Sequence, residues 1–185
     1  MGLFGIPGLH TPEDLRTMAK QAKDRVDELT QTVVASRAGD GARAIRMLDD
    51  LSEAATLVTD IAQALRAVHP HREFAQAAEM VFMDMSNTVS KLNINTQIAK
   101  VVDSIVDQGK RQPSSLSTEE LASAVVLQSD FTNSGIHLPS QERDKFVALS
   151  EQVLQLCSTL FEEPSIDVPH VQVSIHVTRH HPPFF

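Results

Sequence analysis

Apolar residues recur three and four positions apart through most of this 185-residue chain. Because an α-helix turns once every 3.6 residues, that spacing gathers them on one helical face. The first such stripe consists of Leu15, Met18, Ala22, Val26, Leu29 and Val33. Further stripes lie within residues 45–68, 74–92, 98–105, 121–131 and 146–160. Each stripe needs another apolar surface to cover it, so the pattern predicts an all-α, bundle-like domain of five or six helices.

Residues that cap helices mark the expected boundaries. Thr11, Pro12 and Asp14 resemble a capping box with proline at the first helical position, and they predict a helix over residues 12–36 that ends near Gly39. Further along the chain, helix ends or starts are expected at these positions: the 39–41 loop, His69-Pro70, the stretch 93–95, the Ser117 to Glu120 capping box, Gly135 and Pro139-Ser140.

The last stripe has heptad spacing. It consists of Phe146, Leu149, Val153, Leu156 and Leu160. A short heptad run is more often a seam inside a helical bundle than a coiled coil, so we expect this stripe to be buried in the bundle.

After residue 162 the character of the chain changes. The segment 163–185 is rich in proline and histidine, and residues 171–178 alternate between apolar and polar types as a strand would. The sequence therefore predicts three parts: an N-terminal arm over 1–10, a helical domain over 11–162, and an irregular or strand-like tail over 163–185.

Composition limits the classes of function. Apolar residues make up 42% of the chain and charged residues 22%, a globular balance in which aromatics are only 4%. The formal net charge of −8 argues against nucleic acid or an anionic membrane surface as a partner. No apolar run reaches the roughly 18 residues that a membrane-spanning helix needs. Residues 1–10 carry no visible transit peptide, which would be rich in arginine.

Two pairs of histidines are candidate metal ligands. His176 and His180 are four residues apart, but the glutamate that follows the first histidine in zinc peptidases is absent, and the segment alternates as a strand. We favour a histidine-rich tail over a metal site. His69 and His71 flank a proline at a helix break, which suits a turn better than metal ligation.

One glycine motif resembles a dinucleotide-binding fingerprint. Residues 39–44 read G-x-G-x-x-A, and Asp60 follows about twenty residues later. The preceding residues have a helical pattern rather than a strand pattern, and Asp60 falls within a helix. The motif is therefore interpreted as a turn between helices.

No complete catalytic constellation emerges from the remaining residues. Cys157 is the only cysteine, and we expect a buried structural thiol because no basic group or helix N-terminus lies nearby in sequence. Adjacent acids are interpreted as solvated helix faces and ends: Asp49-Asp50, Glu119-Glu120 and Glu162-Glu163. We therefore predict no catalytic, cofactor-binding or metal-ligating residue in this chain.

Four segments, in order and at family spacing, resemble the N-terminal region of the mitochondrial intermediate peptidases, especially the fungal ones. They are Gly2 to Leu9 (GLFGIPGL), Leu51-Ser52-Glu53 with the helix ending at His69-Pro70, Lys91 to Asn95 (KLNIN), and Asp130 to Leu138 (DFTNSGIHL). The resemblance covers about residues 2–162. These enzymes are zinc metallopeptidases of the thimet oligopeptidase family.

The resemblance implies a mostly helical, two-lobed shell around a channel, and the N-terminal part forms part of the wall of that channel. It also implies a zinc held by the histidines of an H-E-x-x-H motif and a downstream glutamate, with the motif glutamate activating the bound water. The implied activity is the removal of octapeptides from imported precursor proteins in the mitochondrial matrix. Imported precursors or oligopeptides are therefore the implied partners, together with the catalytic lobe.

The H-E-x-x-H motif is absent from these 185 residues, so no family catalytic residue is carried onto this chain. We expect a fragment truncated before the zinc motif, which binds no zinc and is inactive alone. The alternative is a non-catalytic helical interaction module. A weaker third hypothesis is a metal-binding histidine tail.

Overall fold

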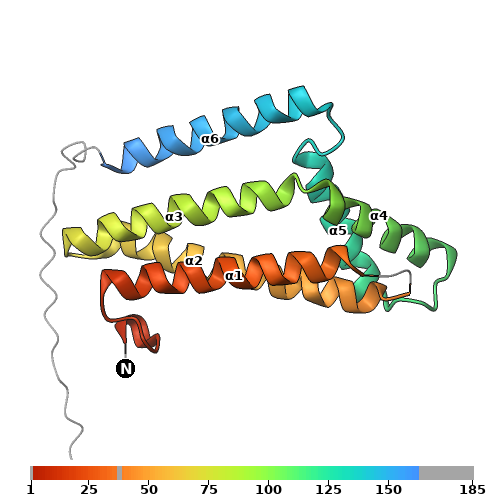
Figure 1. Cartoon of the computed structure of the whole chain (residues 1–185), viewed down its shortest axis with the longest axis horizontal. Helices are drawn as coiled ribbons and strands as arrows, with labels where there is room; N and C mark the ends of the chain where they lie inside the picture. Colours follow the sequence, from red (N-terminus) through yellow and green to blue (C-terminus); the bar gives the residue numbers. More distant parts are fainter. Residues whose placement is uncertain (1, 37–38, 163–185) are drawn as a thin grey trace, which may run out of the picture.

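A computed structural model describes residues 2–36 and 39–162. Within those ranges it contains a short 3-10 helix and six α-helices, and no strand. The elements are η1 (Leu3–Gly5), α1 (Pro12–Val34), α2 (Gly41–Val68), α3 (Arg72–Asn93), α4 (Thr96–Arg111), α5 (Thr118–Asn133) and α6 (Ser140–Glu162). The predicted all-α, bundle-like fold is confirmed (Figure 1). The tail over 163–185, with its strand-like alternation, lies outside the described residues.

The first helix begins as expected and ends two residues early. Thr11 Oγ1 accepts a hydrogen bond of 3.2 Å from the Asp14 amide, and Asp14 Oδ2 accepts one of 2.7 Å from the Thr11 amide. The helix ends at Val34 rather than at Ser36. The Ser36 amide donates to the Val33 carbonyl, a three-residue step that tightens the chain and ends the α-helix.

A break at residues 94–95 separates α3 from α4, within the stretch 93–95 where the sequence predicted an interruption. Asn95 is the N-cap of α4, and its Oδ1 accepts hydrogen bonds of 2.9 Å from the Gln97 amide and 3.2 Å from the Ile98 amide. The asparagine side chain thus satisfies two backbone donors that a helix start leaves open.

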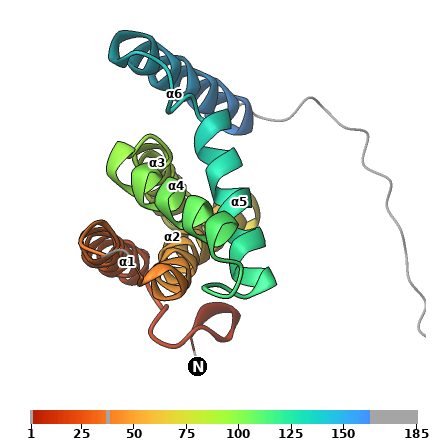
Figure 2. The same cartoon turned by 90° about the vertical axis from the view of Figure 1, so that its right-hand side faces the viewer.

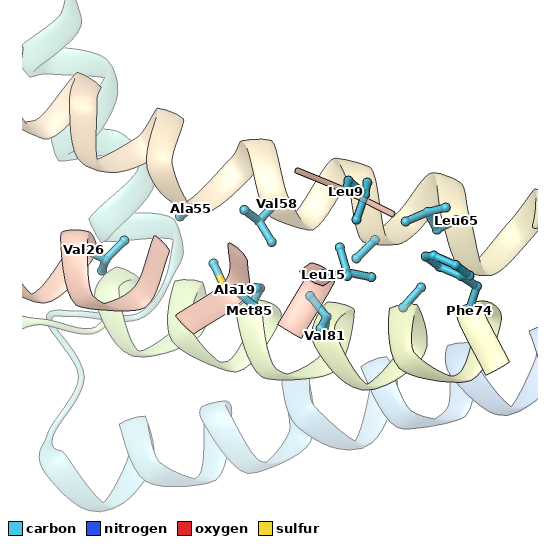
Figure 3. Close-up of a cluster of buried hydrophobic side chains, with 12 residues drawn as sticks. Leu9, Leu15, Ala19, Val26, Ala55, Val58, Leu65, Phe74, Val81 and Met85 are labelled. Atoms are coloured by element: carbon cyan, nitrogen blue, oxygen red, sulfur yellow. The ribbon is translucent and has the colours of Figure 1, made fainter. Parts of the chain in front are cut away.

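Helices α1, α2 and α3 pack around a core of apolar, mostly aliphatic side chains (Figure 3). Leu15, Leu65 and Met85 are fully buried there, one from each helix. The N-terminal segment adds Leu9, which is also fully buried, because the chain turns back through a hydrogen bond from the Leu3 amide to the Leu9 carbonyl. Residues that precede the first helix therefore contribute to the core.

A second core joins the N-terminal half of α2 to α4 and α5. Ile45, Leu48, Val102 and Val106 are buried in it. The close packing depends on Gly109, because a Cβ at that position would lie 2.6 Å from a Leu121 methyl carbon. Helix α2 contributes to both cores and so connects them into one body.

Helix α6 lies at the periphery. It runs alongside α3 on the side of that helix away from α1, and both views place it outside the bundle of α1 to α5 (Figures 1 and 2). Its attachment to that bundle is the main structural departure from the sequence-based expectation.

Candidate protein-interaction surface on helix α6

Helix α6 meets the rest of the molecule through one narrow face. Ser158 is its only buried residue among those whose side chains are described, and Arg143, Val147 and Leu154 are half-buried. These positions are spaced by four, seven and four residues, so they share one side of the helix. Arg143 Nη1 donates to the carbonyls of Ile136 at 3.2 Å and Leu138 at 3.4 Å, which fixes the start of α6 to the preceding loop.

A polar joint holds this face against α3 and α2. The Ser158 hydroxyl donates a hydrogen bond to Glu79 Oε1, and Glu79 Oε2 lies 2.9 Å from Arg66 Nη1. The side chains of Arg66 and Glu79 are only 8% and 18% exposed, respectively. The Arg66 guanidinium carbon lies 3.8 Å from the centre of the Phe82 ring. The joint links three helices through groups that are largely removed from water.

Sequence reasoning did not find this joint. Arg66 and Glu79 lie on different helices, 13 residues apart, and Ser158 is 79 residues beyond Glu79. Each residue type is ordinary on an exposed helix face, so no local pattern distinguished them. Only the packing of α2, α3 and α6 brings the three side chains together.

The opposite face of α6 carries the predicted heptad stripe, and it is turned outward. The exposed fractions of Phe146, Leu149, Val153 and Leu156 range from 40% to 66%. The expectation of a buried bundle seam is therefore wrong for these four residues. Ser158 is nine residues from Leu149, about two and a half helical turns, which places these two residues on opposite sides of the helix. The side chain of Leu160 is not among those described.

Cys157 is exposed, which corrects the expectation of a buried thiol. It directly follows Leu156, so it lies at the edge of the outward stripe rather than on the docked face. An apolar sequence neighbourhood indicated burial, but the side of the helix that meets the bundle decides the exposure of each position.

The histidines at the α2–α3 junction have the turn role that was predicted. The His71 amide donates to His69 Nδ1 at 3.2 Å, and the two imidazole ring centres lie 5.5 Å apart. The His69 ring also packs on Phe74, with 4.3 Å between ring centres. These contacts close the turn between α2 and α3 around Pro70.

The glycine motif is a turn between helices, as interpreted. Asp40 is the N-cap position of α2, Gly41 is its first residue, and the chain before residues 37–38 is α1. Asp60 is exposed in the middle of α2. No strand precedes the motif within residues 2–36, so the arrangement differs from a dinucleotide-binding fold.

One residue of the Glu119-Glu120 pair has a structural role. Glu120 Oε2 accepts a 2.9 Å hydrogen bond from the Ser117 amide, and Glu120 Oε1 lies 2.8 Å from Arg46 Nη1. The bond from the Ser117 amide lowers the pKa of Glu120, with further lowering by the Ser117 hydroxyl and Arg46. Asp49 and Asp50 are exposed on α2.

The described residues contain no group of three or more His, Cys, Asp or Glu side chains placed to hold a metal ion. His176, His180 and Glu163 lie outside that part of the chain, and the side chain of Glu162 is not described either. Among helices α1 to α6, none combines the length and apolarity that crossing a membrane requires.

The fold and this surface define an all-α protein domain with an outward, apolar helix face. The chain is 34% identical over 164 residues to the mitochondrial intermediate peptidase of Mycosarcoma maydis, 34% over 166 residues to that of Malassezia globosa, and 31% over 157 residues to that of Rattus norvegicus. The chain is therefore related to the mitochondrial intermediate peptidases, and the predicted resemblance is confirmed.

The aligned region covers most of this chain but only a small part of each relative. These three matches cover 84% to 89% of the chain but only 18% to 22% of the peptidases. The chain thus spans about a fifth of the length of these relatives, which is consistent with the expected correspondence to an N-terminal region. No family model matches the chain, and no solved structure matches it.

Proposed function

We propose that this chain is the helical N-terminal part of a mitochondrial zinc metalloendopeptidase, with residues 11–162 as its N-terminal lobe. The enzyme removes octapeptides from imported precursor proteins in the matrix. The similarity to mitochondrial intermediate peptidases across most of the chain carries this proposal. The all-α bundle supports this proposal, because a packed helical lobe can form part of the wall of a peptide channel.

Zinc chemistry is assigned to the longer protein. The described residues do not fit a zinc site, because they offer no cluster of three ligating side chains. The chain alone is therefore expected to hold no zinc and to cleave no octapeptide substrate. One zinc per chain in metal analysis, together with hydrolysis, would contradict that part of the proposal.

A segment exchange tests the function. Residues 11–162 would replace the matching segment of the Mycosarcoma maydis relative, and octapeptide removal from an imported precursor would be measured. The hybrid is expected to process the precursor, whereas a variant with the segment deleted is expected to be inactive. A hybrid that folds and holds zinc but is as inactive as the deletion variant would refute the proposal.

A second candidate function is a non-catalytic helical interaction module. The outward stripe of α6 favours it, because contiguous apolar surface on a folded domain marks interaction sites. An interaction module is expected to be monodisperse, with one defined mass, and to unfold cooperatively as an isolated chain. A lobe separated from its enzyme is expected to unfold broadly or to aggregate.

A further inference from the structure

We propose that the outward stripe of α6 is the surface through which this chain packs against the rest of a longer peptidase. The stripe consists of Phe146, Leu149, Val153 and Leu156. Its occupant is an apolar surface in the part of the longer protein that lies outside the match to this chain. The proposal rests on the proposed function, because it takes the chain as the N-terminal part of that protein.

The stripe is a continuous apolar surface that the bundle leaves uncovered. Its four residues are 40% to 66% exposed, and their spacing of three, four and three places them in one row along the helix. The other large apolar side chains that are exposed within residues 2–36 and 39–162 occur singly or as the adjacent pair Val125 and Val126. Single exposed apolar residues are ordinary on a protein surface, whereas a continuous row marks an interaction site.

The residues around α6 are distributed as on a helix that is covered on two sides. One side is the docked face, where Ser158 bonds to α3. Asp144, Glu151 and Gln155 are spaced by seven and four residues, so they share another side, and all three are exposed. Val153 is nine residues from Asp144, so these two residues lie on opposite sides of the helix. A helix that met water over its whole outer surface would carry polar residues along the stripe as well.

Charged residues border the stripe near the start of α6. Glu142 lies one turn before Phe146, and Lys145 directly precedes Phe146. Beside the rest of the stripe the neighbours are uncharged: Ser150, Gln152 and Cys157. Covering the last three residues of the stripe with an apolar surface therefore buries no neighbouring charge, which would be costly without a partner. The chemistry of the stripe fits an apolar partner surface rather than a charged one.

The extent of the relatives indicates what covers the stripe. The alignment with the Malassezia globosa peptidase covers 89% of this chain but only 20% of that relative. The share of the chain outside the alignment is smaller than the segment 163–185 that follows α6, so α6 lies within the aligned part. The relative thus combines a counterpart of α6 with a large amount of further protein. A second copy of the chain is a poorer occupant, because a formal net charge of −8 opposes self-association.

Thiol labelling of a single reporter cysteine on α6 tests this. In a C157S background, V153C reports on the stripe, and Q155C is the matched control on the polar side of the same helix. Labelling by a water-soluble maleimide is followed by mass spectrometry of the α6 peptide, both in the full chain and in the hybrid with the Mycosarcoma maydis relative. In the hybrid, V153C is expected to label roughly tenfold more slowly than in the chain, whereas Q155C is expected to change by less than about twofold.

The labelling and the processing assay separate this proposal from the proposed function. A hybrid that processes precursor while V153C labels as fast as in the chain would overturn the interface and leave the function standing. An inactive hybrid in which V153C is protected would support the interface and count against the function. Protection of V153C in the isolated chain as its concentration rises would assign the stripe to a second copy and overturn the proposal.

Two double variants give an independent readout. L149Q/V153Q places amides on the stripe, and its control A148Q/E151Q places them on exposed positions of the polar side. In the hybrid, only L149Q/V153Q is expected to lower the urea midpoint of unfolding, because buried amides without partners are destabilising. In the isolated chain both variants are expected to keep the wild-type midpoint. Equal midpoints for the two variant hybrids would contradict the interface.

If the hybrid does not fold, hydroxyl-radical footprinting of the natural Mycosarcoma maydis peptidase addresses the same surface. Side chains aligned with the stripe are expected to be oxidised less than those aligned with the polar side of α6. Equal oxidation of the two sides would overturn the proposal.

Discussion

At the scale of single residues, two helix starts are built from reciprocal hydrogen bonds. Thr11 with Asp14 begins α1, and Ser117 with Glu120 begins α5. In each pair the hydroxyl accepts from the third backbone amide while the carboxylate accepts from the cap amide. Both pairs could be predicted from sequence because every partner lies within three residues.

These capping carboxylates predict a dependence of stability on pH. The Thr11 hydroxyl, with the His10 and Thr11 amides, lowers the pKa of Asp14 below its ordinary value of 3.8, and the Ser117 amide lowers that of Glu120 below 4.5. A lowered folded-state pKa means that the contribution is complete above those values and is lost as the pH falls below them. Urea unfolding from pH 6 to 2 would measure it.

The double variant D14N/E120Q separates these two groups from the other acids. Its free energy of unfolding is expected to fall less steeply below pH 4.5 than that of the wild type, because neither replacement can take up a proton there. Identical slopes for the two proteins would contradict the assignment.

At the scale of helices, α6 is attached less securely than the others. Its buried anchor is the hydrogen bond from Ser158 to Glu79, whereas α1 to α5 bury apolar side chains in two cores. Helix–helix packing normally supplies most of the stability of a helix in a protein. The docked face of α6 is narrow, so α6 is the helix expected to open first.

Ser158→Ala tests that expectation. Loss of a hydrogen bond to a carboxylate costs about 1.5 kcal/mol, so amide hydrogen exchange in α6 is expected to become roughly tenfold faster while α1 to α3 are unchanged. Ser150→Ala is the control, because the Ser150 hydroxyl donates its hydrogen bond to the Phe146 carbonyl of the same helix. Equal acceleration by both variants would show that the joint does not anchor α6.

At the scale of the whole molecule, α2 unites the two cores. Its C-terminal half, with Leu65, packs against α1 and α3, and its N-terminal half, with Ile45, packs against α4 and α5. Disruption of either core therefore disturbs a helix that the other core also needs. We expect α1 to α5 to unfold as one cooperative unit.

Leu65→Ala measures the strength of this arrangement. Truncating a fully buried leucine costs about 2–5 kcal/mol of unfolding free energy, and denaturation followed by circular dichroism should shift as a single transition. Leu57→Ala, at an exposed position of the same helix, should change the free energy by less than about 0.5 kcal/mol. Two separate transitions within α1 to α5 in the Leu65→Ala variant would contradict the cooperative unit.

The helices and the family resemblance could both be predicted from local sequence patterns. Helical periodicity, the capping boxes and the interruption within 93–95 are local patterns, which can be recognised in a sequence because their residues are neighbours in the chain. The turn roles of His69 and His71 were predicted for the same reason.

Which face of each helix is covered depends on how the helices pack together. Periodicity shows that Phe146, Leu149, Val153 and Leu156 share a side of α6, but it does not say which surface lies opposite that side. The bundle meets α6 through Ser158 instead, so the stripe and Cys157 are exposed. Burial depends on side chains brought together from distant parts of the chain, as in the Arg66, Glu79 and Ser158 joint, and no local pattern contains that information.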